Sequence, residues 1–354
     1  MGVKRVLIVR TSSMGDLIHT LPAVSDIASH FPGVAVDWVA EEGFAEIPAW
    51  HPAVDRVIPV AMRRWRKAWF SPAVRRERAA YIRQLQERTY DAVIDSQGLL
   101  KSAALVALRA RGPRHGLDWH SAREPAASLF YQHRHRVEPM QPAVFRYRTL
   151  AGLALGYAPE NPPDFSLGVL DGAPDPVTLD DGSVWPGPRG AGNYAAIMPS
   201  ASRDTKLWPE NHWQAVLRQL DAQGCAPLVF AGNQEERARA ARITEGIASA
   251  RVLPRMALVQ TARVVAGARI MVGLDSGITH LAAALGRPTV GIYCATPVVR
   301  TPLTGPAYCA SLGDRGQPPS LDEVQRCVAE ALDAPARDAG AGIAAGAQAA
   351  GMGR

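Results

Sequence analysis

Short apolar runs that alternate with helical stretches constrain this chain more than any other feature. Each run is nearly continuous, as a strand covered on both faces of a parallel sheet would be, and the stretches between the runs supply crossover helices. The predicted strands lie at residues 5–9, 34–39, 57–60 and 92–94 in the first half, and at 194–198, 228–230, 270–274 and 289–293 in the second. Predicted helices span residues 76–87 and a segment that opens at Pro209 with Trp213, Val216, Leu217 and Leu220 on one face. We therefore expect an α/β protein with two wound parallel sheets.

The length of the chain and its changes in composition predict two domains. At 354 residues the chain exceeds the usual size of one domain. Residues 171–192 are rich in Gly, Pro and Asp and are the predicted linker between an N-terminal domain, residues 1–170, and a C-terminal domain, residues 193–335. Residues 336–354 are rich in Ala and Gly, and we expect a disordered tail there. Two sheets of this kind place a ligand between them, at the carboxyl ends of the strands.

Composition and cysteine usage indicate a cytoplasmic globular protein. Hydrophobic residues make up 47% of the chain and charged residues 20%, as in ordinary globular domains. The four cysteines form no CxxC pair and no cluster with metal-ligand spacing, so we expect reduced thiols and no metal site. The start of the chain lacks the features of a signal peptide, and no apolar run reaches the roughly 18 residues of a membrane span.

The net charge of +6 comes entirely from the first half of the chain. Residues 1–170 hold 22 Lys/Arg against 16 Asp/Glu, whereas residues 171–354 hold 17 of each. Seven of the basic residues lie between Arg63 and Arg78, interleaved with tryptophan and phenylalanine. This mixture suits an anionic membrane surface, a phosphorylated acceptor or nucleic acid, and the ordinary alternative is a solvated helix face.

The turn after the first predicted strand opens a helix and reads Thr11-Ser12-Ser13-Met14-Gly15-Asp16. It lacks the GxGxxG pattern of dinucleotide-binding turns, which argues against an NAD or FAD enzyme. Asp16 has two interpretations of similar weight. It is either an N-terminal helix cap or a general base that takes the proton from an attacking hydroxyl.

Three turns of the second half carry charged side chains at predicted strand ends. Lys206 precedes a predicted helix and is placed to neutralise a diphosphate, although a solvated lysine is the common alternative. Asp275 and His280 flank the helix start at Ser276, whose amides suit a phosphate; a helix cap and a core histidine are the alternatives. Glu236 is predicted to accept the hydroxyls of a ribose, unless it is only an acidic residue at a helix start.

Five strings along the chain carry a family resemblance. They are Thr11-Ser12-Ser13-Met14-Gly15-Asp16, Arg63-Arg64-Trp65-Arg66-Lys67-Ala68-Trp69-Phe70-Ser71, Asp118-Trp119 with Ala122-Arg123-Glu124-Pro125, Arg203-Asp204 with Lys206, and Asp275-Ser276-Gly277 with His280-Leu281. In this order they resemble the ADP-heptose:lipopolysaccharide heptosyltransferases, glycosyltransferase family nine, and among them the enzymes that add the first heptose to Kdo-lipid A. The resemblance spans about residues 4–330.

The resemblance implies a GT-B fold, in which two Rossmann-like domains face a central cleft. It implies an N-terminal domain that binds the acceptor, Kdo-lipid A, and a C-terminal domain that binds the donor, ADP-heptose. The implied reaction is an inverting displacement without metal or other cofactor, in which an acceptor hydroxyl deprotonated by Asp16 attacks the anomeric carbon as ADP leaves. Such an enzyme of lipopolysaccharide core biosynthesis is peripheral to the cytoplasmic face of the inner membrane and has no nucleic-acid partner.

The resemblance also implies residue roles by matching position. The catalytic residues are Asp16 as base and Lys206 as the diphosphate contact. The donor-binding residues are Ser202, Lys206, Glu236 at the adenosine ribose, Met256 against adenine, and Asp275, Ser276, Gly277 and His280. The acceptor-binding residues, for Kdo carboxylates and lipid phosphates, are Ser13, Arg63, Arg64, Arg66, Lys67, Gln97, Lys101 and Arg123.

Other functions stay open from the sequence. The closest alternative is heptosyltransferase II, or another glycosyltransferase of this fold with a different core acceptor. The string Arg63–Ser71 favours an enzyme that adds the first heptose over this alternative. A non-catalytic nucleotide or nucleic-acid binder could also use the basic half. Comparing the binding of RNA, DNA and ADP-heptose would separate these classes.

Overall fold

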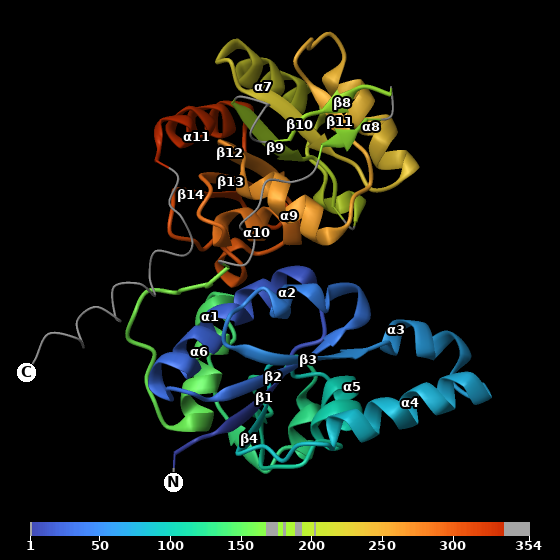
Figure 1. Cartoon of the computed structure of the whole chain (residues 1–354). Helices are drawn as coiled ribbons and strands as arrows, with labels where there is room; N and C mark the ends of the chain where they lie inside the picture. The colour runs from blue at the N-terminus through green and yellow to red at the C-terminus, as the bar shows by residue number, and fades with distance from the viewer. Residues whose placement is uncertain (1, 168–175, 180–181, 188–192, 202, 336–354) are drawn as a thin grey trace, which may run out of the picture. The chain divides into compact units, whose positions relative to one another are not determined.

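Two compact units make up this chain (Figure 1). The computed structural model describes residues 2–167, 176–179, 182–187, 193–201 and 203–335. The first unit is Met1–Ser166 and the second is Leu167–Arg354. Each unit has its own parallel sheet and its own hydrophobic core.

The first unit is built on a six-stranded parallel sheet with the order β3-β2-β1-β4-β5-β6. Its strands are β1 (Arg5–Val9), β2 (Ala35–Glu41), β3 (Val54–Val60), β4 (Ala92–Asp95), β5 (Arg114–Leu117) and β6 (His133–His135). Its helices are α1 (Met14–His30), α2 (Glu46–Ala49), α3 (Met62–Trp65), α4 (Pro72–Leu85), α5 (Leu100–Ser102) and α6 (Ala143–Leu155), with short helical turns at Glu42–Phe44, Arg66–Ala68, Ala103–Ala107 and Pro125–Phe130. The four predicted strands are confirmed. β5 and β6 were missed because they are short and polar, so no apolar run marks them.

Strand β1 shows why the apolar runs predicted the sheet. It lies between β2 and β4, so that Ile8 pairs with both Trp38 and Ile94. A strand in this position has no solvent-facing side, and Leu7 and Val9 are accordingly buried. Helix α1 follows β1 and packs against α6 (Figure 1).

The second unit repeats this plan with the strand order β11-β10-β9-β12-β13-β14, again all parallel. Its strands are β9 (Tyr194–Met198), β10 (Ala226–Phe230), β11 (Arg251–Leu253), β12 (Ile270–Leu274), β13 (Thr289–Tyr293) and β14 (Cys309–Gly313). Its helices are α7 (Glu210–Ala222), α8 (Gln234–Thr244), α9 (Leu258–Ala266), α10 (Gly277–Ala284) and α11 (Leu321–Asp333), with short turns at Asp204–Lys206 and Val298–Arg300.

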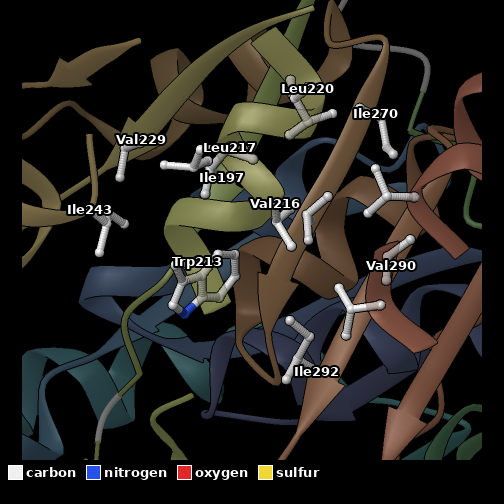
Figure 2. Close-up of a cluster of buried hydrophobic side chains, with 14 of the residues drawn as sticks. Ile197, Trp213, Val216, Leu217, Leu220, Val229, Ile243, Ile270, Val290 and Ile292 are labelled. Atoms are coloured by element: carbon white, nitrogen blue, oxygen red, sulfur yellow. The ribbon is translucent and has the colours of Figure 1, made fainter. Parts of the chain in front are cut away.

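The core of the second unit confirms the predicted face of α7. Figure 2 shows four side chains of this helix packed over the sheet; they are Trp213, Val216, Leu217 and Leu220, and all are buried. They meet Ile197 of β9, Val229 of β10 and Ile270 of β12. Burying an apolar side chain of this size contributes about 1.5–3 kcal/mol, so one helix face accounts for much of the cohesion on this side of the sheet.

In both sheets the strand order reverses beside the first strand of the unit. The first strand, β1 or β9, is neighboured by the fourth, β4 or β12, and the chain runs outward from this pair in both directions. Doubly wound sheets bind their ligands at the carboxyl ends of the strands at such a switch point. The loops after β1, β4, β9 and β12 are therefore the places to look for a site.

Two predicted segments fall largely or wholly outside the described residues. Within the predicted linker, the described residues form a two-stranded antiparallel ladder of β7 (Val177–Thr178) and β8 (Val184–Trp185), which its composition did not predict. The predicted tail, residues 336–354, lies outside the described residues.

Candidate active site

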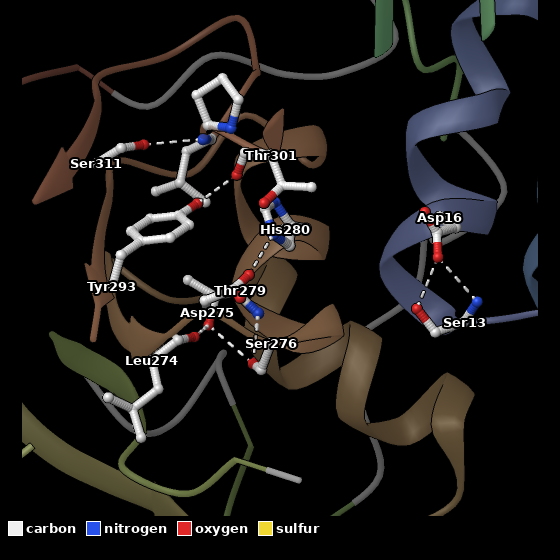
Figure 3. A network of polar contacts seen from close by, with 12 residues as sticks. Ser13, Asp16, Leu274, Asp275, Ser276, Thr279, His280, Tyr293, Thr301 and Ser311 are labelled. Atoms are coloured by element: carbon white, nitrogen blue, oxygen red, sulfur yellow. Dashed lines mark hydrogen bonds and ion pairs between the residues drawn. The ribbon is translucent and has the colours of Figure 1, made fainter. Parts of the chain in front are cut away.

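Asp16 lies in the first turn of α1, at the carboxyl end of β1 and so at the switch point of the first sheet. Its Oδ2 accepts hydrogen bonds from the backbone N–H and the hydroxyl of Ser13, at 3.1 and 2.9 Å (Figure 3). Its Oδ1 accepts a hydrogen bond from the hydroxyl of Tyr147 on α6, at 2.8 Å. Ser13 is thus the N-cap of α1, and Asp16 is the N3 residue that completes its capping box. Asp16 also has a second donor, the Tyr147 hydroxyl, that the capping box does not require.

The surroundings of Asp16 keep its carboxylate charged. Burial alone would raise the pKa of Asp16, but the positive charges of Arg10 and His19, with the hydrogen bonds from Ser13 and Tyr147, outweigh it and lower the pKa. Ser13 is exposed, so its hydroxyl sits on the open side of this carboxylate. An ionised carboxylate in contact with a hydroxyl is the arrangement that general-base catalysis needs.

Gln97, predicted to contact the acceptor, supports the turn that leads to Asp16. Its side-chain oxygen accepts hydrogen bonds from the backbone N–H and the hydroxyl of Thr11, at 2.8 and 2.7 Å. The residue is buried. This oxygen is therefore engaged within the first unit, and the acceptor contact of Gln97 stays a prediction.

The basic segment, defined as residues 63–78, follows the carboxyl end of β3 and forms α3, a short turn and the start of α4. The side chains of Arg63, Arg66 and Lys67 are exposed. Within the described part of the chain, neither Arg66 nor Lys67 has an ion-pair partner. No ion pair in the described residues therefore competes for Arg66 and Lys67, and the contact of this segment with the acceptor stays a prediction.

Arg64 differs from its neighbours because two carboxylates hold its guanidinium. It donates to Glu42 at 3.1 Å and to Glu77 of α4 at 2.8 Å, and these hydrogen bonds raise the pKa of Arg64. Glu77 also accepts a hydrogen bond from the Trp65 ring nitrogen at 2.8 Å. Arg64 thus ties α3 to α4, a role that the sequence did not indicate.

Lys101 lies on the short helix α5 and Arg123 on the loop after β5, and both are exposed. The segments after β4 and β5 that carry them contact each other. The Leu100 N–H donates to Glu124 Oε2 at 2.7 Å, and the Glu124 N–H donates to the Gly98 carbonyl at 3.0 Å. Gly98 has a φ of +63°, and a Cβ there would lie 3.4 Å from the Arg123 nitrogen. The positive φ therefore favours glycine at this turn, whereas a Cβ at that distance from Arg123 would be in ordinary van der Waals contact.

Lys206, Asp275 and His280 form a largely buried cluster in the second unit, after β9 and β12. Figure 3 shows Asp275 and His280 of this cluster. The Lys206 Nζ lies 2.6 Å from Asp275 Oδ2, and the His280 Nε2 lies 3.2 Å from Asp275 Oδ1. Burial opposes ionisation, yet His280 and Lys206 together hold the pKa of Asp275 well below its ordinary value. The predicted phosphate-binding lysine is therefore oriented by a carboxylate at the second switch point.

Ser276, rather than Asp275, is the N-cap of α10, so the cap interpretation of Asp275 is wrong. The Ser276 hydroxyl accepts a hydrogen bond from the Thr279 N–H at 3.4 Å, and the Thr279 hydroxyl donates to the Leu274 carbonyl at 2.6 Å (Figure 3). A Cβ on Gly273 would lie 2.5 Å from Thr279 Oγ1, so glycine is required for this contact. These contacts fix the start of α10 against β12.

Glu236 and Met256, two further predicted donor residues, follow β10 and β11 at the same edge of the second sheet. Glu236 lies in the first turn of α8, and its Oε2 accepts the Gly232 N–H at 2.6 Å. One carboxylate oxygen is thus engaged at the helix start, and the ribose contact stays a prediction. Met256 is half-buried. Ser202 lies outside the described residues.

Two residues beside Asp16 were missed from the sequence. Arg10 is buried directly after β1, and a charge immediately after a buried strand was the signal available for it. Tyr147 reaches Asp16 from 131 positions away, and in the sequence it reads as an ordinary core residue of α6. No local pattern marks such a long-range partner.

Two further properties bear on chemistry and location. No group of three or more His, Cys, Asp or Glu side chains in the described ranges is arranged to hold a metal ion. The helices of that part of the chain include none that is long and apolar enough to cross a bilayer.

Comparison with known proteins places this geometry in a family. Residues 78–329 match the model of glycosyltransferase family 9 (heptosyltransferase). The chain is 49% identical to lipopolysaccharide heptosyltransferase 1 of Escherichia coli strain K12 over 293 residues, which are 82% of this chain and 88% of that protein. It is 46% identical to lipopolysaccharide heptosyltransferase 1 of Pseudomonas aeruginosa over 293 residues, 82% of this chain and 79% of that protein.

Solved structures agree with the sequence comparison. The E. coli heptosyltransferase WaaC with ADP matches with a TM-score of 0.80 and 44% identity, over 92% of this chain and 99% of that chain. ADP-heptose lps heptosyltransferase II of E. coli matches with a TM-score of 0.68 at 22% identity, over 93% of this chain and 97% of that chain, a likeness of fold alone. The expected GT-B fold with two Rossmann-like units is confirmed. The chain belongs to glycosyltransferase family 9, the heptosyltransferases.

Proposed function

We propose that this chain transfers heptose from ADP-heptose to the Kdo of Kdo-lipid A in lipopolysaccharide inner-core biosynthesis, with inversion and with Asp16 as general base. The high identity to lipopolysaccharide heptosyltransferases 1 supports the reaction and its substrates. The observation that carries the assignment of the base is the position of the Asp16 carboxylate at a switch point, where its Oδ2 accepts a hydrogen bond from the hydroxyl of the exposed Ser13. Nearby positive charges and hydrogen bonds lower the pKa of this carboxylate.

The Ser13 hydroxyl indicates where the acceptor would bind. In the proposed reaction, an acceptor hydroxyl takes its place at Asp16 Oδ2. Its oxygen forms the new bond to the anomeric carbon, its proton passes to Asp16, and the bond between that carbon and the ADP oxygen breaks with its electron pair leaving on ADP. Attack on the face opposite the leaving group inverts the anomeric centre.

The leaving ADP gains negative charge, which the second unit is suited to stabilise. Lys206 supplies an ammonium, and the amides at the start of α10 point toward the same edge of the sheet. Asp275 orients Lys206 before the donor arrives, and no metal is needed in this scheme. We assign Ser202, Glu236 and Met256 to the nucleotide by the resemblance alone.

The acceptor is strongly anionic, and exposed cations of the first unit suit it. Arg63, Arg66, Lys67, Lys101 and Arg123 all follow strands at the carboxyl edge that carries Asp16. Kdo carboxylates and lipid phosphates are the groups that such side chains bind well.

The basic segment also supports peripheral binding to the cytoplasmic face of the inner membrane. Phe70 at its turn is 87% exposed, an unusual position for a large apolar side chain. Arg78 lies over the neighbouring Trp69 ring, 3.4 Å from its centroid. Exposed aromatic and basic side chains together are typical of proteins that rest on anionic lipid surfaces.

Replacing the proposed base tests the function directly. We expect Asp16→Asn to bind ADP-heptose normally and to lose about 10²-fold or more of kcat, because the amide cannot take the proton. The measurement is ADP release from ADP-heptose and Kdo-lipid A, together with the mass of the lipid product. Turnover within a few-fold of the unmodified protein would remove Asp16 from the role of base.

Glu323 provides a matched control for the capping role of Asp16. Its Oε2 accepts hydrogen bonds from the N–H and the hydroxyl of Ser320, the N-cap of α11, at 2.8 and 2.9 Å. This is the geometry that Asp16 makes with Ser13. Glu323→Gln therefore makes the same change from carboxylate to amide at the same kind of helix start, and its kcat should stay unchanged.

A further inference from the structure

Asp16 differs from an ordinary capping carboxylate in one contact. Glu323 has the same two hydrogen bonds from its N-cap serine and makes no hydrogen bond to a side chain of another helix in the described part of the chain. Asp16 has such a bond, from the Tyr147 hydroxyl on α6 to Oδ1 at 2.8 Å. The capping of α1 does not require the hydrogen bond from the Tyr147 hydroxyl, so this bond has another role.

Tyr147 is held rigidly where it makes this bond. Its side chain is buried. The guanidinium carbon of Arg10 lies 4.0 Å from the centroid of its ring. Arg10 is itself fixed, because its Nε donates to the Ser96 hydroxyl at 3.2 Å and its Nη2 donates to the Ser96 carbonyl. The Tyr147 ring therefore packs between the interior of the first unit and the guanidinium of Arg10, which its hydrogen bonds to Ser96 hold in place.

We propose that Tyr147 is a positioning residue, clamped by Arg10, that holds Asp16 with Oδ1 occupied and Oδ2 directed to the acceptor hydroxyl. Without the Tyr147 hydroxyl the carboxylate could rotate and exchange its two oxygens. With it, a single oxygen serves as the base. This inference rests on the proposed role of Asp16 as base.

The charges around Asp16 agree with this arrangement. Arg10 from the end of β1, His19 on α1 and Tyr147 on α6 face the carboxylate, and Arg146 lies near Tyr147. Burial raises the pKa of Tyr147, so its hydroxyl stays protonated and remains a donor at every pH at which the enzyme would work. Because this donor favours the charged carboxylate, its removal should raise the pKa of Asp16.

Tyr147→Phe tests the proposal, because it removes one oxygen atom and leaves the ring beneath Arg10. We expect the acidic limb of the kcat/KM profile to move up by about one pH unit. We expect kcat on the plateau to fall about tenfold as the carboxylate loses its fixed orientation, while KM for ADP-heptose stays within about twofold. Arg10→Lys keeps a positive charge but lacks the planar guanidinium that lies over the Tyr147 ring. It should shift the acidic limb of the kcat/KM profile by less than Tyr147→Phe does.

Tyr157→Phe is the matched control. Tyr157 follows α6 in the same unit, and its hydroxyl is buried with no hydrogen-bond partner among the described residues. This variant also removes a tyrosine oxygen, but it should leave the pH profile and kcat unchanged. A shift of equal size in both variants would overturn the proposal, since it would report a general effect of losing a buried hydroxyl.

A direct titration separates this inference from the proposed function. The pKa of the Asp16 carboxyl can be followed by ¹³C NMR of aspartate-labelled protein, with Asp16→Asn assigning the signal. A higher Asp16 pKa in Tyr147→Phe supports the proposed effect of the Tyr147 hydrogen bond on this carboxylate. An active Asp16→Asn would instead contradict the base assignment, and with it the catalytic purpose of that contact, whatever the titration shows. An Asp16 pKa and a pH profile both equal to those of the unmodified protein would overturn the positioning role.

Discussion

Asp275 exposes only 10% of its side chain, yet it carries a negative charge between Lys206 and His280. A carboxylate in such a place is stable only while its partners remain, because burial penalises an unpaired charge. Its ion pair with Lys206 therefore does two things: it compensates a charge that burial would otherwise penalise, and it presents the ammonium at the carboxyl edge of the sheet.

The stability of the protein should depend on the charge of Asp275. Its pKa is lowered by folding, so its contribution is complete above the unfolded value of about 4 and is lost as the pH falls through the folded value. Asp275→Asn should lower the free energy of unfolding by about 1–3 kcal/mol at pH 7, and the difference from the unmodified protein should shrink below about pH 4. Urea unfolding from pH 7 to pH 3 measures this. A difference in the free energy of unfolding between Asp275→Asn and the unmodified protein that does not change with pH would refute this prediction. Asp322→Asn, at an exposed aspartate, is the control.

At the level of elements, the basic segment contains arginines with ion-pair partners and arginines without them. Arg63 and Arg66 project from α3 and the following turn without an ion-pair partner in the described residues. Arg64, between them in sequence, is held by Glu42 and Glu77. The helical spacing alone turns neighbouring side chains to different surroundings.

Substitution in the basic segment should therefore depend on position. Arg63→Met and Arg66→Met should each raise KM for Kdo-lipid A by about tenfold, because each removes an unpaired cation from the proposed acceptor surface. Arg64→Met should raise it by less than about threefold, since its charge is already compensated by two carboxylates. Steady-state kinetics at varied concentrations of Kdo-lipid A measures KM for each of the three variants. Equal effects at all three positions would mean that the Arg64 ion pairs open when the acceptor binds.

For the whole molecule, the uneven distribution of charge along the chain predicts that the N-terminal unit is the part that binds an anionic membrane surface. The first 170 residues carry all of the excess positive charge, and the exposed Phe70 lies among them. An anionic bilayer would attract this unit electrostatically and bind the aromatic side chain at its interface.

Vesicle sedimentation tests this prediction. The protein should bind vesicles of phosphatidylglycerol and phosphatidylethanolamine, and binding should weaken strongly above about 0.5 M salt, where charges are screened. Phe70→Ala should reduce binding about threefold or more, whereas Val184→Ala, at an exposed apolar side chain of the second unit, should not. Equal binding to neutral phosphatidylcholine vesicles would contradict the electrostatic account.

Much of the fold followed from the sequence, because buried parallel strands read as apolar runs. All eight predicted strands are present, and so is the buried face of α7. The short polar strands β5 and β6 were missed, as were β11 and β14 at the edges of the second sheet. The helix predicted at residues 76–87 begins earlier, at Pro72. The predicted site residues other than Ser202 do follow strands at the carboxyl edges, since a parallel sheet gathers all such loops at one edge.

The sequence by itself determined the two wound sheets, the edges at which the polar loops lie, and the family. The tertiary structure alone decided the partners of individual side chains: Tyr147 on Asp16, Thr11 on Gln97, Glu77 on Arg64 and Asp275 on Lys206. The physical reason is that the periodicity of apolar residues records only which face of a helix or strand is buried. A hydrogen bond instead requires two atoms within about 3 Å of each other, and segments far apart in the chain bring those atoms together only in the folded protein.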